Sequence, residues 1–118
     1  MKKFLLILII SIITINIFAE KTCKYTYQSN MGKFDPETNL IIELIYQIDQ
    51  CDVISGKDIN KLILESQKQI LEVFSPVECV VGKGGVESDI EYLTNEKIKE
   101  VYKKELNFKI LKMRYKFE

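Results

Sequence analysis

The chain has 118 residues, with 17 Lys and Arg against 17 Asp and Glu, and it contains no histidine. A chain of this length forms one domain with a core of modest size. The absence of histidine removes the commonest general base and the commonest metal ligand. We therefore expect no enzyme activity, no metal and no other cofactor, and the balanced charge gives no reason to expect a nucleic-acid partner.

The N-terminal segment, residues 1–19, has the pattern of a secretory signal peptide. Two lysines follow the initiating methionine, and an apolar run covers residues 4–18. This run is shorter than the about 20 residues that a membrane-spanning helix needs. Ala19 is the only alanine in the chain and supplies the small residue that cleavage requires. We expect cleavage between Ala19 and Glu20 and a single exported domain over residues 20–118, periplasmic or secreted; an uncleaved anchor is the alternative.

The stretch TCKYTYQ, residues 22–28, opens the mature chain with a regular alternation of Cys and Tyr with polar residues. Such alternation predicts a short, half-buried strand. Asp35 then stands in the position of a helix N-cap, with Pro36 at the first helical position. Apolar residues at helical spacing predict a helix from Pro36 to Cys51, with a stripe formed by Ile41, Leu44, Ile45, Ile48 and Cys51.

A second helix is predicted to begin after Ser55, which stands in capping-box spacing with Asp58. Its apolar face would be formed by Ile59, Leu62, Ile63, Ile70, Val73 and Phe74. The pair Ser75-Pro76 is expected to end it. Because the link to the preceding helix is short, the two helices should form an antiparallel hairpin.

The stretch VECVVGKGGVESDIEYL, residues 77–93, is predicted to form two short strands around its glycines. Glu87, Asp89 and Glu91 would then share one strand face, which we interpret as a solvated face rather than as an acid and base pair. A third helix should begin at Thr94. The alternation within KILKMRYKF, residues 109–117, predicts a final strand, and a helical continuation is the alternative for this segment.

The predicted fold is therefore an α+β domain. A helical hairpin and a third helix would pack on a short antiparallel sheet. This order of elements fits one domain with all helices on one face of the sheet.

Three cysteines, Cys23, Cys51 and Cys79, predict one disulfide in an exported chain. The predicted helical hairpin would hold Cys51 and Cys79 too far apart to bond. Any bridge must therefore join Cys23 to either Cys51 or Cys79. We favour Cys23–Cys79, because pairing of two predicted strands would bring these residues together. Cys23–Cys51 and the absence of any bridge are the alternatives.

Charge is unevenly distributed along the mature chain. Residues 97–118 carry eight Lys and Arg against three Glu, whereas residues 20–96 carry seven Lys against fourteen Asp and Glu. The alternating cations of the last segment are candidates for binding an anionic surface: Lys109, Lys112, Arg114 and Lys116. Protection of an edge strand against sheet-to-sheet association is the other account of these side chains.

Size, export and the lack of catalytic groups together indicate a small non-enzymatic binding module of the inhibitor or immunity-factor kind. Its expected partner is a protein of the cell envelope whose identity the sequence does not give. The alternative is an envelope-surface protein that holds anionic lipid or another polyanion through its basic C-terminal segment. The sequence does not indicate an oligomeric state.

Overall fold

The computed structural model describes residues 21–82 and 86–118. The predicted signal segment and its cleavage site between Ala19 and Glu20 lie outside the described residues. Within the two described ranges, no helix combines the length and the apolar character needed to cross a membrane.

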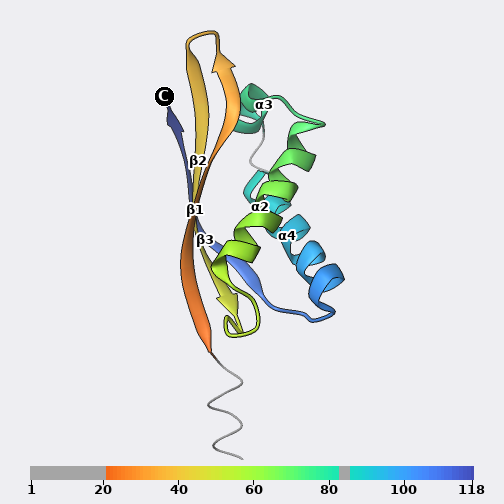
Figure 1. Ribbon diagram of the computed structural model, residues 1–118. Coiled ribbons are helices and arrows are strands. Elements are labelled where there is room, and N and C mark those ends of the chain that lie inside the picture. Colours follow the sequence, from red (N-terminus) through yellow and green to blue (C-terminus); the bar gives the residue numbers. More distant parts are fainter. Residues whose placement is uncertain (1–20, 83–85) are drawn as a thin grey trace, which may run out of the picture.

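The fold is α+β, as predicted, with an antiparallel sheet and helices on one of its faces (Figure 1). The sheet has the strand order β1-β2-β3, formed by β1 (Thr22–Asp35), β2 (Thr38–Asp49) and β3 (Phe108–Phe117). Between β2 and β3, the described chain forms α2 (Gly56–Leu71), α3 (Pro76–Val81) and α4 (Val86–Tyr102).

The predicted helix from Pro36 to Cys51 is wrong, because this segment forms a turn and then strand β2. Asp35 Oδ1 accepts a hydrogen bond from the backbone N–H of Glu37 at 2.8 Å. An Asp side chain can accept a backbone hydrogen bond at the start of a helix or within a tight turn, so the sequence signal is ambiguous. Here it closes a hairpin in which Asp35 pairs with Thr38.

The apolar pattern of β2 also fits two periods. From Leu40 onward every second side chain is buried: Leu40, Ile42, Leu44, Tyr46 and Ile48. Of the residues between them, only Ile41 is buried as well. This alternation is that of a strand covered on one face, and the isoleucines and the tyrosine favour extended backbone. Ile45, which belongs to the predicted helical stripe, is exposed. The predicted helical hairpin is therefore absent from this part of the chain.

Helix α2 is present as predicted, but Val73 and Phe74 of its predicted apolar face lie beyond its end and are exposed. The Ser55 side chain accepts a hydrogen bond from the N–H of Asp58 at 3.2 Å, which is the first half of a capping box. The helix ends at Leu71, before Ser75-Pro76. Gly56 allows its first turn to approach the sheet closely, since an added Cβ would lie 3.0 Å from the ring of Tyr25.

The two strands predicted for the stretch 77–93 are wrong, because the described parts of it are helical. Ser75 caps α3 in a complete capping box with Glu78, and Pro76 occupies the start of this helix. Pro76 is thus a signal for the start of a helix rather than only for the end of the preceding one. The predicted glycine turn falls partly on residues 83–85, which lie outside the described residues.

Helix α4 begins at Val86, earlier than the predicted start at Thr94. Its buried side chains recur every four residues: Val86, Ile90, Thr94 and Ile98. This spacing forms one helical face. Glu87 and Glu91, four residues apart, therefore lie on one side of the helix and Asp89 on another, so the three residues form no strand face.

The predicted strand at the C-terminal end is confirmed as β3, and its helical alternative is wrong. β3 pairs antiparallel with β2, with Lys112 opposite Ile45 and Phe108 opposite Ile48. One irregularity lies between Ile45 and Tyr46 of β2, where Leu111 of β3 has no opposite residue.

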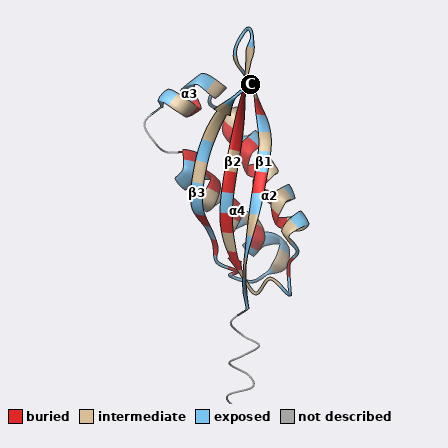
Figure 2. Cartoon of the chain, turned by 90° about the vertical axis from the view of Figure 1, so that its left-hand side faces the viewer, coloured by how far each residue is buried: buried red, intermediate tan, exposed pale blue. Residues whose placement is uncertain are grey.

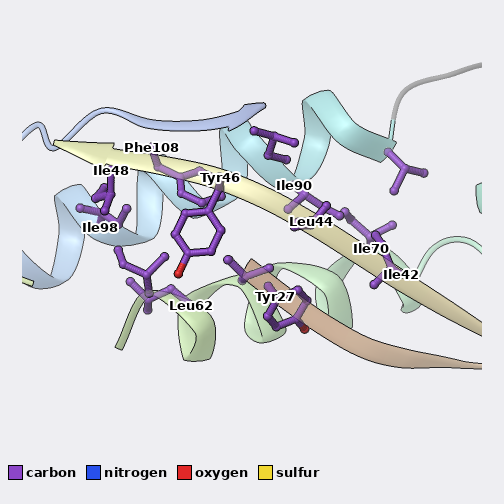
Figure 3. Packing of buried hydrophobic residues seen from close by; sticks show 14 of the residues in the cluster. Tyr27, Ile42, Leu44, Tyr46, Ile48, Leu62, Ile70, Ile90, Ile98 and Phe108 are labelled. Carbon is purple, nitrogen blue, oxygen red and sulfur yellow. The ribbon is translucent and has the colours of Figure 1, made fainter. Parts of the chain in front are cut away.

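The core lies between the sheet and the helices α2 and α4 (Figure 3). The Tyr46 ring packs against Phe108 with a centroid distance of 5.0 Å. The Tyr46 hydroxyl donates to Asn60 Oδ1 of α2 at 2.7 Å, so its polar end is satisfied inside the core. Each fully buried Leu or Ile side chain contributes about 1.5 to 3 kcal/mol to stability, and this layer therefore holds the helices on the sheet.

One disulfide joins Cys23 to Cys51, with a Cα–Cα distance of 5.9 Å. The favoured pairing Cys23–Cys79 is wrong, and Cys79 is a buried free thiol. The reason is the strand β2, which pairs Cys23 with Ile48 and so brings Cys51, just after the strand, beside Cys23. The bridge closes the open end of the β1–β2 hairpin.

Candidate functional site

The sheet has one face that no helix covers (Figures 1 and 2). The even-numbered side chains of β2 from Leu40 to Ile48 are buried beneath the helices. Because side chains alternate along a strand, Ile41, Glu43, Ile45 and Gln47 lie on the opposite, helix-free face. This face is the candidate functional site.

The four cations singled out in the sequence lie together on this face. In the register of β2 and β3, Gln47, Ile45, Glu43 and Ile41 stand opposite Lys109, Lys112, Arg114 and Lys116. Directly opposite residues of an antiparallel pair project to the same side of the sheet. The structure therefore arranges the four cations as one column along β3, which we call the basic column.

Half of the basic column is paired with carboxylates. Arg114 Nε contacts Glu43 Oε2. Lys116 Nζ lies 3.5 Å from Glu43 Oε1 and 3.3 Å from Glu118 Oε1. The hydrogen bond from Arg114 lowers the pKa of Glu43, which therefore stays ionised. Exposed pairs of this kind contribute little to stability, and their main effect is to reduce the local positive charge.

The other half of the basic column is unpaired. Across the described ranges, neither Lys109 nor Lys112 has an ion-pair partner. Both side chains are exposed. The end of the column nearest the start of β3 is therefore its most positive part.

An apolar side chain occupies the centre of the helix-free face. Ile45 is 41% exposed, although its strand is the middle one of the three. It lies at a shallow hollow of about 440 Å³, which is lined by Thr26, Tyr27, Gln28, Glu43, Leu44, Ile45, Lys112 and Arg114. The hollow thus combines an apolar floor with amide, hydroxyl and charged groups around it.

The β1 side of the face is mostly uncharged. Lys24, Thr26, Gln28 and Asn30 stand opposite Gln47, Ile45, Glu43 and Ile41. Only Lys24 among these β1 residues carries a charge. The face therefore has a basic side along β3 and a neutral polar side along β1.

A second hollow, of about 460 Å³, lies at the other side of the molecule near α3. Its lining includes the apolar residues Phe74 and Val81 and the acidic residues Glu78 and Asp89. Gly82 and Val86 also line it. Its acidic rim contrasts with the basic column on the sheet.

The carboxylates that the sequence placed in one row do not converge on a reaction centre. Glu91 Oε2 accepts a hydrogen bond from the backbone N–H of Ile110 at 2.9 Å, so this carboxylate holds α4 to β3. Within residues 21–82 and 86–118, no group of three or more His, Cys, Asp or Glu side chains is arranged to hold a metal ion.

Comparison with known proteins yields no match, whether with protein-family models, with curated proteins or with solved structures.

The four cations could be identified from the sequence, but the places of Glu43 and Ile45 beside them could not. The predicted helix over residues 36–51 would have placed Ile45 in the core and Glu43 away from the cations. The alternation from Leu40 to Ile48 is the signal that locates both residues on the helix-free face.

Proposed function

We propose that this chain is a small exported, non-enzymatic binding module that contacts a protein partner through the helix-free face of its sheet. Inhibitors and immunity factors are the classes of protein that this description fits best. The observation that supports the proposal is the exposed Ile45 at a hollow with polar and charged walls. An apolar centre with a polar rim is the usual composition of a protein–protein interface.

The charge of the face favours an acidic partner. Lys109 and Lys112 have no carboxylate beside them in the described chain, whereas Glu43 reduces the charge of Arg114 and Lys116. A partner with a carboxylate opposite Lys112 and an apolar side chain opposite Ile45 would complement this arrangement. Such charge complementarity accelerates association and selects the partner more than it raises affinity.

Export is part of this proposal. The Cys23–Cys51 disulfide is consistent with an oxidising location outside the cytosol. Cleavage between Ala19 and Glu20 predicts a mature protein that begins at Glu20. Mass spectrometry of the protein recovered from the envelope of a bacterial host tests this, and a mass that retains residues 1–19 would contradict cleavage.

Site-specific photo-crosslinking tests the proposed interface. A photoreactive amino acid in place of Ile45 should give one discrete protein adduct in envelope extract. The same amino acid in place of Lys61, which is exposed on α2, is the matched control and should give none. Equal adducts from both positions, or no adduct from position 45, would contradict the proposal.

Charge reversal provides a second test of the same interface. Lys112→Glu should reduce the yield of the adduct formed at position 45, because it places a like charge opposite an acidic partner. Lys61→Glu on α2 changes the net charge equally and should leave the yield unchanged.

The second candidate function is the binding of anionic lipid or another polyanion by Lys109, Lys112, Arg114 and Lys116. The absence of ion partners for Lys109 and Lys112 in the described chain favours it. Co-sedimentation with anionic vesicles should then weaken as salt rises, because charges are screened over about 8 to 10 Å at physiological ionic strength. Equal binding to neutral and anionic vesicles would reject this candidate and leave edge protection as the account of these lysines.

The variant Glu43→Gln tests the second candidate further. It removes the carboxylate that contacts Arg114 and Lys116 and so raises the positive charge of the face. Binding to anionic vesicles should increase in this variant. An acidic protein partner would also favour this added charge, so binding to vesicles that contain no protein is the readout specific to the second candidate.

A further inference from the structure

The two edges of the sheet differ in how they are covered. Because the strand order is β1-β2-β3, both β1 and β3 are edge strands. An edge strand presents backbone N–H and C=O groups that have no partner strand and can pair with another chain. Natural proteins usually cover such edges or place charges and prolines on them.

The β3 edge is covered in its first half by side chains of α4. Asn95 Oδ1 accepts from the N–H of Phe108 at 3.0 Å, and Asn95 Nδ2 donates to the carbonyl of the same residue at 2.8 Å. Glu91 accepts from the N–H of Ile110. The basic column then places a cation on nearly every second residue of β3. The β3 edge is therefore protected both by side chains of α4 and by its own charged residues.

The direction of the backbone groups on β1 follows from two hydrogen bonds. The carbonyl of Lys21 accepts from the N–H of Gln50 at 2.7 Å, on the side of β2. The carbonyl of Asn30 accepts from Gln67 Nε2 of α2 at 3.5 Å, on the outer side. In an antiparallel ladder, the N–H and C=O of one residue point to the same side and the sides alternate. The N–H and C=O groups of Lys24, Thr26 and Gln28 therefore point away from the sheet.

These outward groups have no partner in the described part of the chain. The register of β1 with β2 is regular from Thr22 to Asn30, and the first irregularity follows Asn30. Between Thr22 and Met31, the strand has no proline, and its one charged residue is Lys24. The β1 edge is thus regularly paired from Thr22 to Asn30, nearly uncharged, and open from Lys24 to Gln28.

We propose that this edge pairs with the same edge of a second copy of the chain, antiparallel and about a twofold axis at Thr26. The two sheets would then form one continuous six-stranded sheet. In this dimer the helix-free faces of both copies stay accessible. The proposal is therefore independent of the proposed function.

The register about Thr26 is self-complementary, which is what favours a second copy over a foreign strand. Thr26 stands opposite Thr26 of the second copy, and both present outward N–H and C=O groups. Lys24 stands opposite Gln28 of the second copy, so no like charges oppose each other. On the helix side, Tyr25 stands opposite Tyr27 of the second copy, and cross-strand aromatic pairs stabilise sheets. A twofold interface requires this kind of self-complementary patch.

The position of the axis permits a sharp test, because a side chain at position 26 faces its own copy. Analytical ultracentrifugation of the exported chain, with its disulfide intact, should show a dimer that forms as the protein concentration rises. Thr26→Lys and Thr26→Glu should each be monomeric, since each places like charges opposite each other. An equimolar mixture of the two variants should recover the dimer, because opposite charges then meet.

Two further variants control for effects on the fold. Thr26→Val keeps the backbone N–H and should remain dimeric. Thr26→Pro removes only an outward N–H, a position at which an edge strand tolerates proline, and should be monomeric with an unchanged circular dichroism spectrum. The proposal is overturned if the wild-type chain is monomeric at every concentration. This holds even if the monomer binds an added extended peptide. The proposal is also overturned if the Lys and Glu variants dimerise separately or fail to dimerise when mixed.

Discussion

The hydroxyl groups of Ser66 and Thr94 lie 3.1 Å apart between α2 and α4, and both side chains are fully buried. Ser66 donates its only hydrogen to the carbonyl of Leu62 at 2.9 Å. Thr94 must therefore be the donor in the bond between the two hydroxyls. This polar contact is surrounded by the apolar core that joins the two helices.

The direction of this bond predicts unequal effects of removing its two ends. Ser66→Ala should leave the buried Thr94 hydroxyl without its acceptor and should cost about 1 to 3 kcal/mol in the free energy of unfolding. Thr94→Val should cost less, because Ser66 keeps its bond to Leu62. The double variant should cost less than the sum of the two single variants. Urea unfolding measures all three, and strictly additive values would contradict the bond.

The disulfide predicts a second measurable loss of stability. Replacing Cys23 and Cys51 together by serine should lower the free energy of unfolding by about 2 to 4 kcal/mol, because the unfolded chain regains the freedom of the closed loop. Peptide mapping under non-reducing conditions should recover Cys23 linked to Cys51, and Cys79→Ala should leave this linkage unchanged. Recovery of a Cys23–Cys79 peptide would contradict the structure.

The third cysteine should be unreactive in the folded protein. Cys79 is 4% exposed, and burial raises the pKa of its thiol, with a smaller contribution from the Glu78 carboxylate. Only the thiolate reacts readily with disulfide reagents. A colorimetric thiol assay should detect no fast-reacting thiol in the native protein and one in denaturant. Rapid reaction in the native protein would show that α3 opens easily.

Tyr115 predicts a loss of stability in alkali. Burial raises its pKa to about 12, whereas an unfolded tyrosine ionises near pH 10. Between about pH 10 and pH 12, the unfolded chain therefore loses this proton while the folded chain keeps it, and stability falls as the pH rises. In Tyr115→Phe, the free energy of unfolding measured with urea should fall less steeply between about pH 10 and pH 12. Below about pH 10 its dependence on pH should be unchanged. An unchanged slope would mean that Tyr115 ionises freely in the folded protein.

The elements that sequence reasoning predicted correctly are those with local signals. Helix α2 carries its own cap at Ser55 and Asp58, and β3 carries a plain alternation. The segment of β2 has no such unique signal, because its apolar residues satisfy both the helical and the strand period. Pairing with β1 and β3 on its two sides makes this segment a strand. Of these two partners, β3 lies far along the chain. Such partners are invisible to a reading of one segment.

The same distinction explains which parts of the site could be foreseen. Lys109 joins the basic column only because Leu111 has no opposite residue in β2. The other three cations, Lys112, Arg114 and Lys116, could be predicted to share a face because they alternate within β3. Glu43 and Ile45 could not, because their position depends on β2 being a strand. The prediction of the disulfide was wrong for the same reason, since Cys51 comes beside Cys23 only when β2 pairs with β1.

The placement of α2, α3 and α4 between β2 and β3 has a consequence for the growing chain. The β1–β2 hairpin is local and can form early, but Leu40 meets Phe117 only after all three helices have been synthesised. Contacts between residues so distant in sequence close slowly. Until then, one row of backbone groups of β2 has no partner strand, and much of its apolar surface is exposed to water. A nascent chain in this state exposes an unpaired strand edge that other unfinished chains can join.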